Sequence, residues 1–192
     1  MDLTGLLSGF GLSGAAGLNA YIPLLAVSVL GRFGIVKLSG PFELLTSGWA
    51  IGVIALLLLV ELIVDKVPGA DHVNDIVQSF VRPAAGAVLF ASGSGVLGQT
   101  HPGVSLVCGL LLAFGVHATK AAARPVVNAS TAGIGAPVVS LAEDVTSAVV
   151  SAVAIFIPIL IALFVVAFVA VAIFVWRRYR ALRHKTATAH SG

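Results

Sequence analysis

The sequence predicts an all-α polytopic membrane protein, a compact helical bundle with about four to six membrane-embedded elements. Hydrophobic residues make up 58% of the 192 residues and charged residues only 10%, whereas a soluble domain carries about 25% charged residues. The mean hydropathy is +1.07. The stretch from Val145 to Trp176 contains no charged residue and exceeds the roughly 20 residues that a helix needs to cross a bilayer. The chain has too little polar surface for a soluble protein.

The first apolar run extends from Leu3 to Leu30 and is poorly suited to one straight helix. Several glycines interrupt it, and Pro23 lacks the backbone N–H that a helix interior needs. We therefore expect a break between Asn19 and Pro23. Irregular backbone in a membrane must be covered by protein or line a water-filled cavity. This segment is therefore either a kinked span or a re-entrant hairpin.

A strong membrane span is predicted from Leu45 to Val64, and Pro68-Gly69 ends it. The following segment, Asp71 to Val81, has the pattern of an amphipathic helix, which we interpret as an interfacial helix or a half-helix against the bundle. Its polar face comprises Asp71, Asp75, Gln78 and Arg82. Valine, isoleucine and phenylalanine side chains form the opposite face.

The remaining segments complete the predicted bundle. Pro83 to Gly98 is apolar, short and rich in small residues, as expected of a buried span or a re-entrant element. A regular span is predicted from Val104 to Lys120. In contrast, Val126 to Ala142 contains too many glycine and proline residues to cross as a regular helix. The charge-free stretch from Val145 to Trp176 is the predicted last span.

The two interrupted segments carry similar short motifs, as an inverted repeat would. Ala15 to Pro23 resembles Thr131 to Pro137 once two residues are dropped. Paired interruptions are typical of transporters, whose helix breaks expose backbone groups that bind ions. Asn19 and Asn128 would add side-chain ligands there. Chance similarity, or tight packing of small-residue helices around a kink, would produce the same pattern without a binding site.

Ionisable residues cluster around the end of the second apolar run: Glu61, Asp65, Lys66, Asp71, His72, Asp75 and Arg82. Glu61 and Asp65 are four residues apart and share one helical face. The cluster fits three interpretations: a cation or proton site, structural ion pairing with basic side chains, or a metal site formed by Glu61, Asp65 and His72. A bound cation is the only cofactor that we expect.

A second cluster contains His117, Lys120 and Arg124, which are spaced by three and four residues and therefore share a helical face. This basic stripe would bind an anionic substrate or a lipid phosphate, or it would supply counter-ions for the acidic cluster. Glu143 and Asp144 lie at the predicted start of the last span, where acidic side chains stabilise the positive end of a helix. Charges inside membrane segments are costly, so both clusters are candidate functional sites.

The charge distribution predicts the topology. Residues 1–176 form a single transmembrane domain, and residues 177–192 form a basic, disordered tail in the cytoplasm. The tail is expected to bind anionic lipid, and nothing else in the chain indicates nucleic-acid binding. With this orientation in a bacterial inner membrane, both clusters open on the outer face if Pro83 to Gly98 spans the bilayer. They lie on opposite faces if that element is re-entrant.

Several motifs carry a resemblance to a known family: Ser13 to Pro23, Glu61 to Gly69, Asp71 to Asp75, and Arg82 to Gly86. The chain resembles a family of small bacterial integral-membrane proteins known as a domain of unknown function. The resemblance covers most of the chain, from Leu3 to about Ile173. It implies a membrane protein and brings no established reaction or ligand.

We therefore expect a transporter or channel for a small ion or solute, linked to a cation or a proton, in which Glu61, Asp65 and Asp75 bind the charge. The alternative is a protein that does not transport and instead binds lipid or assists assembly. An enzyme is not expected, because the chain has no His-Glu-x-x-His pair and no evident nucleophile. Expected partners are the lipid bilayer, the transported ion or solute and further copies of the same chain.

Overall fold

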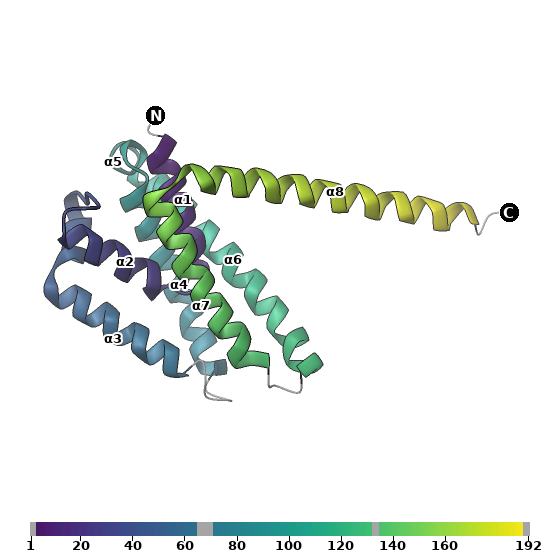
Figure 1. Ribbon diagram of the computed structural model, residues 1–192, viewed down its shortest axis with the longest axis horizontal. Coiled ribbons are helices and arrows are strands. Elements are labelled where there is room, and N and C mark those ends of the chain that lie inside the picture. The colour runs from purple at the N-terminus through teal and green to yellow at the C-terminus, as the bar shows by residue number, and fades with distance from the viewer. Residues whose placement is uncertain (1–2, 65–70, 132–134, 190–192) are drawn as a thin grey trace.

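The computed structural model describes residues 3–64, 71–131 and 135–189, and it leaves out the side chains of residues 71–73, 75, 96, 128–129, 136, 175 and 178–189. The described residues are largely helical and contain no strand, which confirms the all-α prediction. The elements are α1 (Leu3–Leu18), α2 (Tyr21–Arg32), the 3₁₀ helix η1 (Gly40–Thr46), α3 (Gly48–Val64), α4 (Asp71–Gly93), α5 (Val96–Thr100), α6 (Pro102–Thr131), α7 (Gly135–Phe156) and α8 (Ile159–Ala189) (Figure 1).

Three described helices are long and apolar enough to cross a membrane: Ile76–Gly93 of α4, Pro102–Val127 of α6 and Pro137–Phe156 of α7. The bent pair of η1 and α3, which meet at 67°, would form a fourth span if the pair counts as one. Helices α1 and α2 and the first part of α8 are shorter apolar helices. These lengths and compositions fit a multi-pass membrane protein.

Helix α1 lies inside the bundle, in contact with α4, α6 and α7 (Figure 1). Small residues also bring α4 and α6 together. A side chain at Gly86 of α4 would collide with Ala113 of α6 and with the backbone of Gly109, so these two helices touch through their backbones. The same register places Arg82, one turn earlier in α4, beside His117, one turn after Ala113 in α6.

The break predicted in the first apolar run is confirmed. Helix α1 ends at Leu18 and α2 begins at Tyr21, so Asn19 and Ala20 form the junction. Both junction residues are buried. Pro23 follows in the first turn of α2, where its missing N–H costs no helical hydrogen bond.

The predicted division at Pro83 is wrong: α4 is continuous from Asp71 to Gly93 and includes Pro83, so neither an interfacial helix nor a half-helix ends before a separate short element. Its apolar face points away from the bundle, and Phe80 is 77% exposed. Its polar face points inward, where Gln78 and Arg82 are buried. An exposed apolar face suits lipid, so the amphipathic pattern here belongs to a span with a polar interior.

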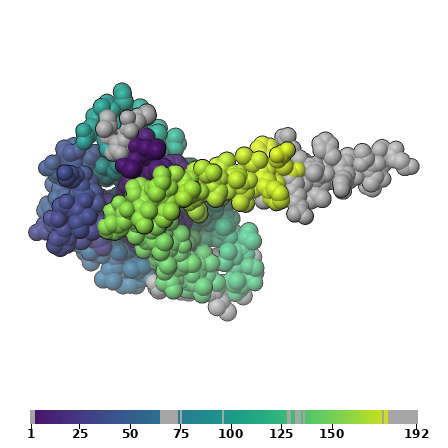
Figure 2. All heavy atoms as spheres, turned by 45° about the horizontal axis from the view of Figure 1, so that its top comes forward, coloured from purple at the N-terminus to yellow at the C-terminus, as the bar shows by residue number. Residues whose placement is uncertain are grey.

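Two helix boundaries in the second half also differ from the prediction. The segment Val126 to Ala142 is not one regular helix, as predicted, because α6 ends in it at Thr131 and α7 begins in it at Gly135. The candidate span of α7 nevertheless starts at Pro137, earlier than the predicted start at Val145. The stretch Val145 to Trp176 is divided, because α7 ends at Phe156 and α8 begins at Ile159. Pro158 lies between them and has no N–H to continue the helix. Helix α8 leaves the bundle as a separate rod (Figure 2). Its bounds extend through the basic segment to Ala189.

Candidate functional site

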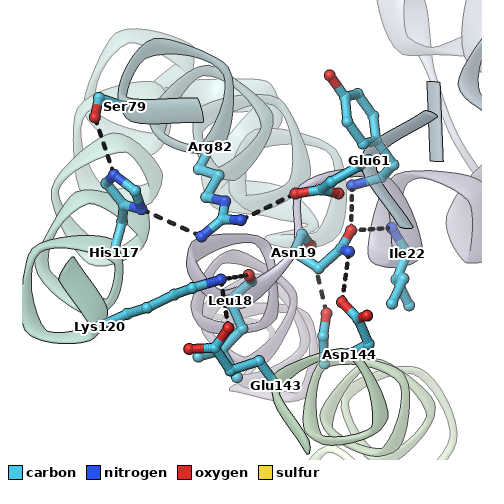
Figure 3. Close-up of polar contacts among 12 residues, drawn as sticks. Leu18, Asn19, Ile22, Glu61, Ser79, Arg82, His117, Lys120, Glu143 and Asp144 are labelled. Carbon is cyan, nitrogen blue, oxygen red and sulfur yellow. Dashed lines mark hydrogen bonds and ion pairs between the residues drawn. The ribbon is translucent and has the colours of Figure 1, made fainter. Parts of the chain in front are cut away.

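A buried polar centre lies where α1 ends, among α3, α4, α6 and α7 (Figure 3). The polar centre comprises the side chains of Asn19, Glu61, Gln78, Arg82, His117, Lys120, Arg124, Glu143 and Asp144. Most of these residues are buried, Arg82 among them. The described members of both predicted clusters therefore meet in one place, together with the first helix break.

Asn19 connects the helix break to α7. Its side-chain oxygen accepts hydrogen bonds from the backbone N–H groups of Tyr21 (3.0 Å) and Ile22 (3.2 Å), so it caps the start of α2. This orientation turns its amide nitrogen toward Asp144, whose Oδ1 lies 2.8 Å away. In the next turn of α7, the Ser147 hydroxyl donates to a carbonyl oxygen of α1 at 3.0 Å. These contacts hold α7 against the end of α1.

Glu61 and Arg82 form the inner ion pair of the polar centre. Arg82 Nη2 donates to Glu61 Oε1 at 2.9 Å, and each side chain is only 1% exposed. Arg82 Nη1 lies 3.3 Å from His117 Nδ1. A guanidinium has only donors, so His117 Nδ1 is the acceptor and the ring proton resides on Nε2, 3.1 Å from the Ser79 hydroxyl. This geometry requires the neutral form of His117.

Lys120, Arg124 and Glu143 form the outer ion group of the polar centre. Glu143 Oε2 lies 2.6 Å from Lys120 Nζ and 3.6 Å from Arg124 Nη2. Lys120 Nζ also donates to the carbonyl oxygen of Leu18 at 3.1 Å. Leu18 is the last residue of α1, where a helix presents partial negative charge. The ammonium group therefore neutralises a carboxylate and a helix end together.

A family assignment covers the whole polar centre. The family model described as Domain of unknown function (DUF4126) matches residues 6–178. The chain belongs to this family. The match confirms the family that the sequence motifs resemble, and every residue of the polar centre lies inside the DUF4126 region. No curated protein and no solved structure matches the chain.

Within the DUF4126 region, the structure brings together five of the predicted site residues: Asn19, Glu61, Arg82, Lys120 and Arg124. The other predicted site residues lie outside the described residues or side chains: Asp65, Asp71, His72, Asp75 and Asn128. From the sequence, the two clusters were expected to lie together only if Pro83 to Gly98 spans the bilayer. In the structure, α4 is one continuous helix, and it places Arg82 inside the bundle beside the second cluster.

The predicted metal site has one described member. Glu61 accepts a hydrogen bond from Arg82, and the other two predicted ligands, Asp65 and His72, lie outside the described residues or side chains. Across the residues that the structure describes, no group of three His, Cys, Asp or Glu side chains could hold a metal ion. The contacts of Glu61 agree with the interpretation as an ion pair.

The predicted capping role of Glu143 and Asp144 is wrong. Both lie in the third turn of α7 rather than at its start, and both enter the polar centre. A sequence signal for the buried role of Asp144 is present in α7. Four polar residues spaced by four, three and four lie on one face of this helix, and all four are buried: Ser140, Asp144, Ser147 and Ser151. A polar stripe of this kind indicates contact with polar groups of the same chain, here the end of α1.

Proposed function

We propose that the protein is a transporter or channel that moves a small ion or solute across the membrane and is linked to a cation or a proton. One observation carries the proposal, the gathering of ionisable side chains at a helix break among candidate spans. These side chains come from four helices: Glu61, Arg82, Lys120, Arg124, Glu143 and Asp144. One ionised side chain at the bilayer centre costs about 2.5–3.5 kcal/mol by insertion scales. Because ionised side chains are costly in the membrane, this gathering of charges supports a functional role for the polar centre.

The helix break supplies backbone groups that a transported species would contact. Helix α1 ends there with carbonyl oxygens, and α2 begins there with the N–H groups that Asn19 caps. In transporters with broken helices, such helix ends bind ions and charged solutes near the middle of the membrane. We place the transported species at this junction, beside Lys120 and Asp144.

The inner ion pair supports a link to protons. His117 Nδ1 accepts from Arg82, so a proton that binds there displaces the guanidinium and brings two positive charges together. The contact joins α4 to α6, and proton uptake would therefore weaken the attachment between these helices. A conformational equilibrium that separates α4 from α6 would be shifted by the proton.

The proposed arrangement has six membrane-embedded elements: α1–α2, η1–α3, α4, α6, α7 and α8. The α1–α2 and η1–α3 elements are the broken ones, and an inverted repeat would relate the α1–α2 break to the α6–α7 connection. We place the protein as a multi-pass homo-oligomer in a bacterial inner membrane. The C-terminal end of α8 faces the cytoplasm in this arrangement, because Arg177 and the basic residues after it satisfy the positive-inside rule.

Reconstitution into proteoliposomes tests the transport proposal. Flux of alkali cations, protons and small solutes would be measured for the wild-type protein and for Glu61→Gln/Arg82→Gln, which removes both charges of the inner ion pair and leaves neither one unpaired. We expect a loss of at least about tenfold in flux. Glu43→Gln, at an exposed position of η1, is the matched control and should keep wild-type flux. Folded wild-type protein that moves none of these species would contradict the proposal.

Helix α8 favours the alternative function, a lipid-binding or assembly protein without transport. After Val165 its described apolar side chains are exposed on every side of the helix up to Phe174, with Phe168 65% and Phe174 63% exposed. Arg177 and further basic residues follow this apolar part and would bind anionic lipid. An anionic lipid that stays bound through delipidation, with no flux in proteoliposomes, would establish this function instead.

A further inference from the structure

Asp144 differs from the other two acidic side chains of the polar centre. Glu61 and Glu143 each pair with a basic side chain. Asp144 Oδ1 accepts a hydrogen bond from the neutral amide of Asn19, and Asp144 Oδ2 has no hydrogen-bond partner among the described residues. The residue is only 8% exposed. A buried carboxylate without a compensating charge is strongly disfavoured, so this oxygen is suited to bind a positive charge.

The surroundings of Asp144 attract cations. Helix α1 ends beside it, and the carbonyl oxygen of Leu18 already binds the ammonium group of Lys120 at 3.1 Å (Figure 3). The end of α1 therefore stabilises positive charge within the structure itself. Asn19 holds the carboxylate at this end, because its own oxygen is fixed by the start of α2 and its amide nitrogen can only donate.

We propose that Asp144, positioned by Asn19, binds a monovalent cation at the α1–α2 break, with Oδ2 as the ligand atom. The cation is an alkali ion or a proton, and both satisfy a carboxylate oxygen in the same way. The inference rests on the proposed transport function and locates its coupling ion at a residue that sequence reasoning assigned to helix capping. Binding itself is measurable without transport.

Among cations, the charge balance of the described side chains favours a monovalent ion over a divalent one. With neutral His117, the described ionisable groups of the polar centre carry three negative and three positive charges: Glu61, Glu143 and Asp144 against Arg82, Lys120 and Arg124. A divalent ion would leave two positive charges in excess, whereas a monovalent ion leaves one, which lies close to the partly exposed outer ion group.

Several ionisable groups surround the proposed site and would contribute to any pH effect. They face it from α3, α4, α6 and α7 and are Glu61, Arg82, His117, Lys120, Arg124 and Glu143. A pH dependence in the wild-type protein alone therefore does not identify Asp144. The difference between the wild-type protein and Asp144→Asn does, since this substitution keeps an acceptor oxygen for Asn19 and replaces the proposed ligand atom, Oδ2, by an uncharged amide nitrogen.

Thermal unfolding of the full chain in detergent provides the measurement. Sodium, potassium and lithium chloride would each be titrated against choline chloride at mildly alkaline pH, and a second series would lower the pH in choline chloride alone. We expect one alkali cation, or the proton, to raise the melting temperature of the wild-type protein saturably by about 2–4 °C. Asp144→Asn should lose this dependence and should already melt higher than wild type in alkaline choline chloride.

Glu43→Gln is the control, because it neutralises an exposed carboxylate of η1, outside the polar centre. This variant should keep both the melting temperature and the ion dependence of the wild-type protein. An ion dependence that survives in Asp144→Asn would overturn the proposal. A wild-type protein that responds to none of the ions would overturn it as well.

Transport assays on the same variants separate this inference from the proposed function. Ion-dependent stabilisation that requires Asp144, without flux in proteoliposomes, would retain the binding site and reject transport. Flux that is undiminished in Asp144→Asn would retain transport and reject the binding site. Loss of both ion dependence and flux in Asp144→Asn is the outcome that we expect.

Discussion

The inner ion pair and the outer ion group use similar chemistry at different depths in the polar centre. Glu61 and Arg82 are each 1% exposed and lie 2.9 Å apart. In the outer ion group, the side chains of Lys120 and Glu143 are 4% and 13% exposed, and Arg124 adds a second cation that is 17% exposed. The inner carboxylate has one described cation, and the outer carboxylate has two. The two groups therefore differ both in the burial of their side chains and in the number of described cations that face each carboxylate.

This difference indicates how the two groups divide their roles. A sealed pair cannot exchange a partner for water, so the inner ion pair chiefly fixes α3 against α4. The outer ion group is more open and has a surplus of positive charge, so its members can exchange partners at lower cost. Lys120 also binds the last carbonyl of α1, so a change of partner by Lys120 would alter a contact at the α1–α2 break. Stability should depend on the inner pair more than on the outer group.

The largest expected effect comes from breaking the inner ion pair. Glu61→Gln should lower the free energy of unfolding by about 3–5 kcal/mol, because it leaves the Arg82 charge buried without its carboxylate. The double variant Glu61→Gln/Arg82→Gln should recover much of that loss. Chemical denaturation in detergent, followed by fluorescence, measures both. If the double variant were as unstable as Glu61→Gln, an unpaired charge would not be the cause.

A smaller effect is expected at the outer ion group. Glu143→Gln should lower the free energy of unfolding by about 1–2 kcal/mol, since Lys120 keeps the Leu18 carbonyl and the ion pair is partly open to water at Glu143. A double-mutant cycle with Lys120→Gln isolates the coupling between the two side chains. We expect this coupling to be smaller than that of the inner pair and to weaken at high salt. A coupling as large as the inner one, and insensitive to salt, would remove the proposed difference between the groups.

The sequence predicted the break in the first apolar run but not the direction of the polar face of α4. Glycine and Pro23 interrupt a helix wherever it is placed, so the break follows from local chemistry. An amphipathic pattern only separates two faces. Whether the face with Gln78 and Arg82 meets water or protein depends on what packs against it, and that partner lies elsewhere in the chain. The bundle supplies the partner through Glu61 and His117.

The role of Asp144 shows a similar limit of sequence reasoning. Its hydrogen-bond partner Asn19 is 125 residues away, and no local pattern pairs two such positions. Its serine neighbours at helical spacing would indicate a buried polar face, but not the element that covers it. The predicted cap required a helix that starts at Glu143, whereas α7 starts at Gly135. An error in one helix boundary therefore changed the assigned chemistry of two acidic residues.

The smallest effect is expected at His117, through which the inner ion pair contacts α6. In His117→Gln, the side-chain oxygen can accept from Arg82 and the amide can donate to Ser79, so we expect a loss of only about 0.5–1 kcal/mol in the free energy of unfolding. His117→Leu cannot accept, and it should cost about 1–3 kcal/mol because the buried guanidinium loses a partner. The contact with Arg82 uses the unprotonated Nδ1 of His117, so acidification should destabilise wild type relative to His117→Gln. Denaturation across a pH series measures this difference, and a constant difference would mean that His117 does not link protons to the contact between α4 and α6.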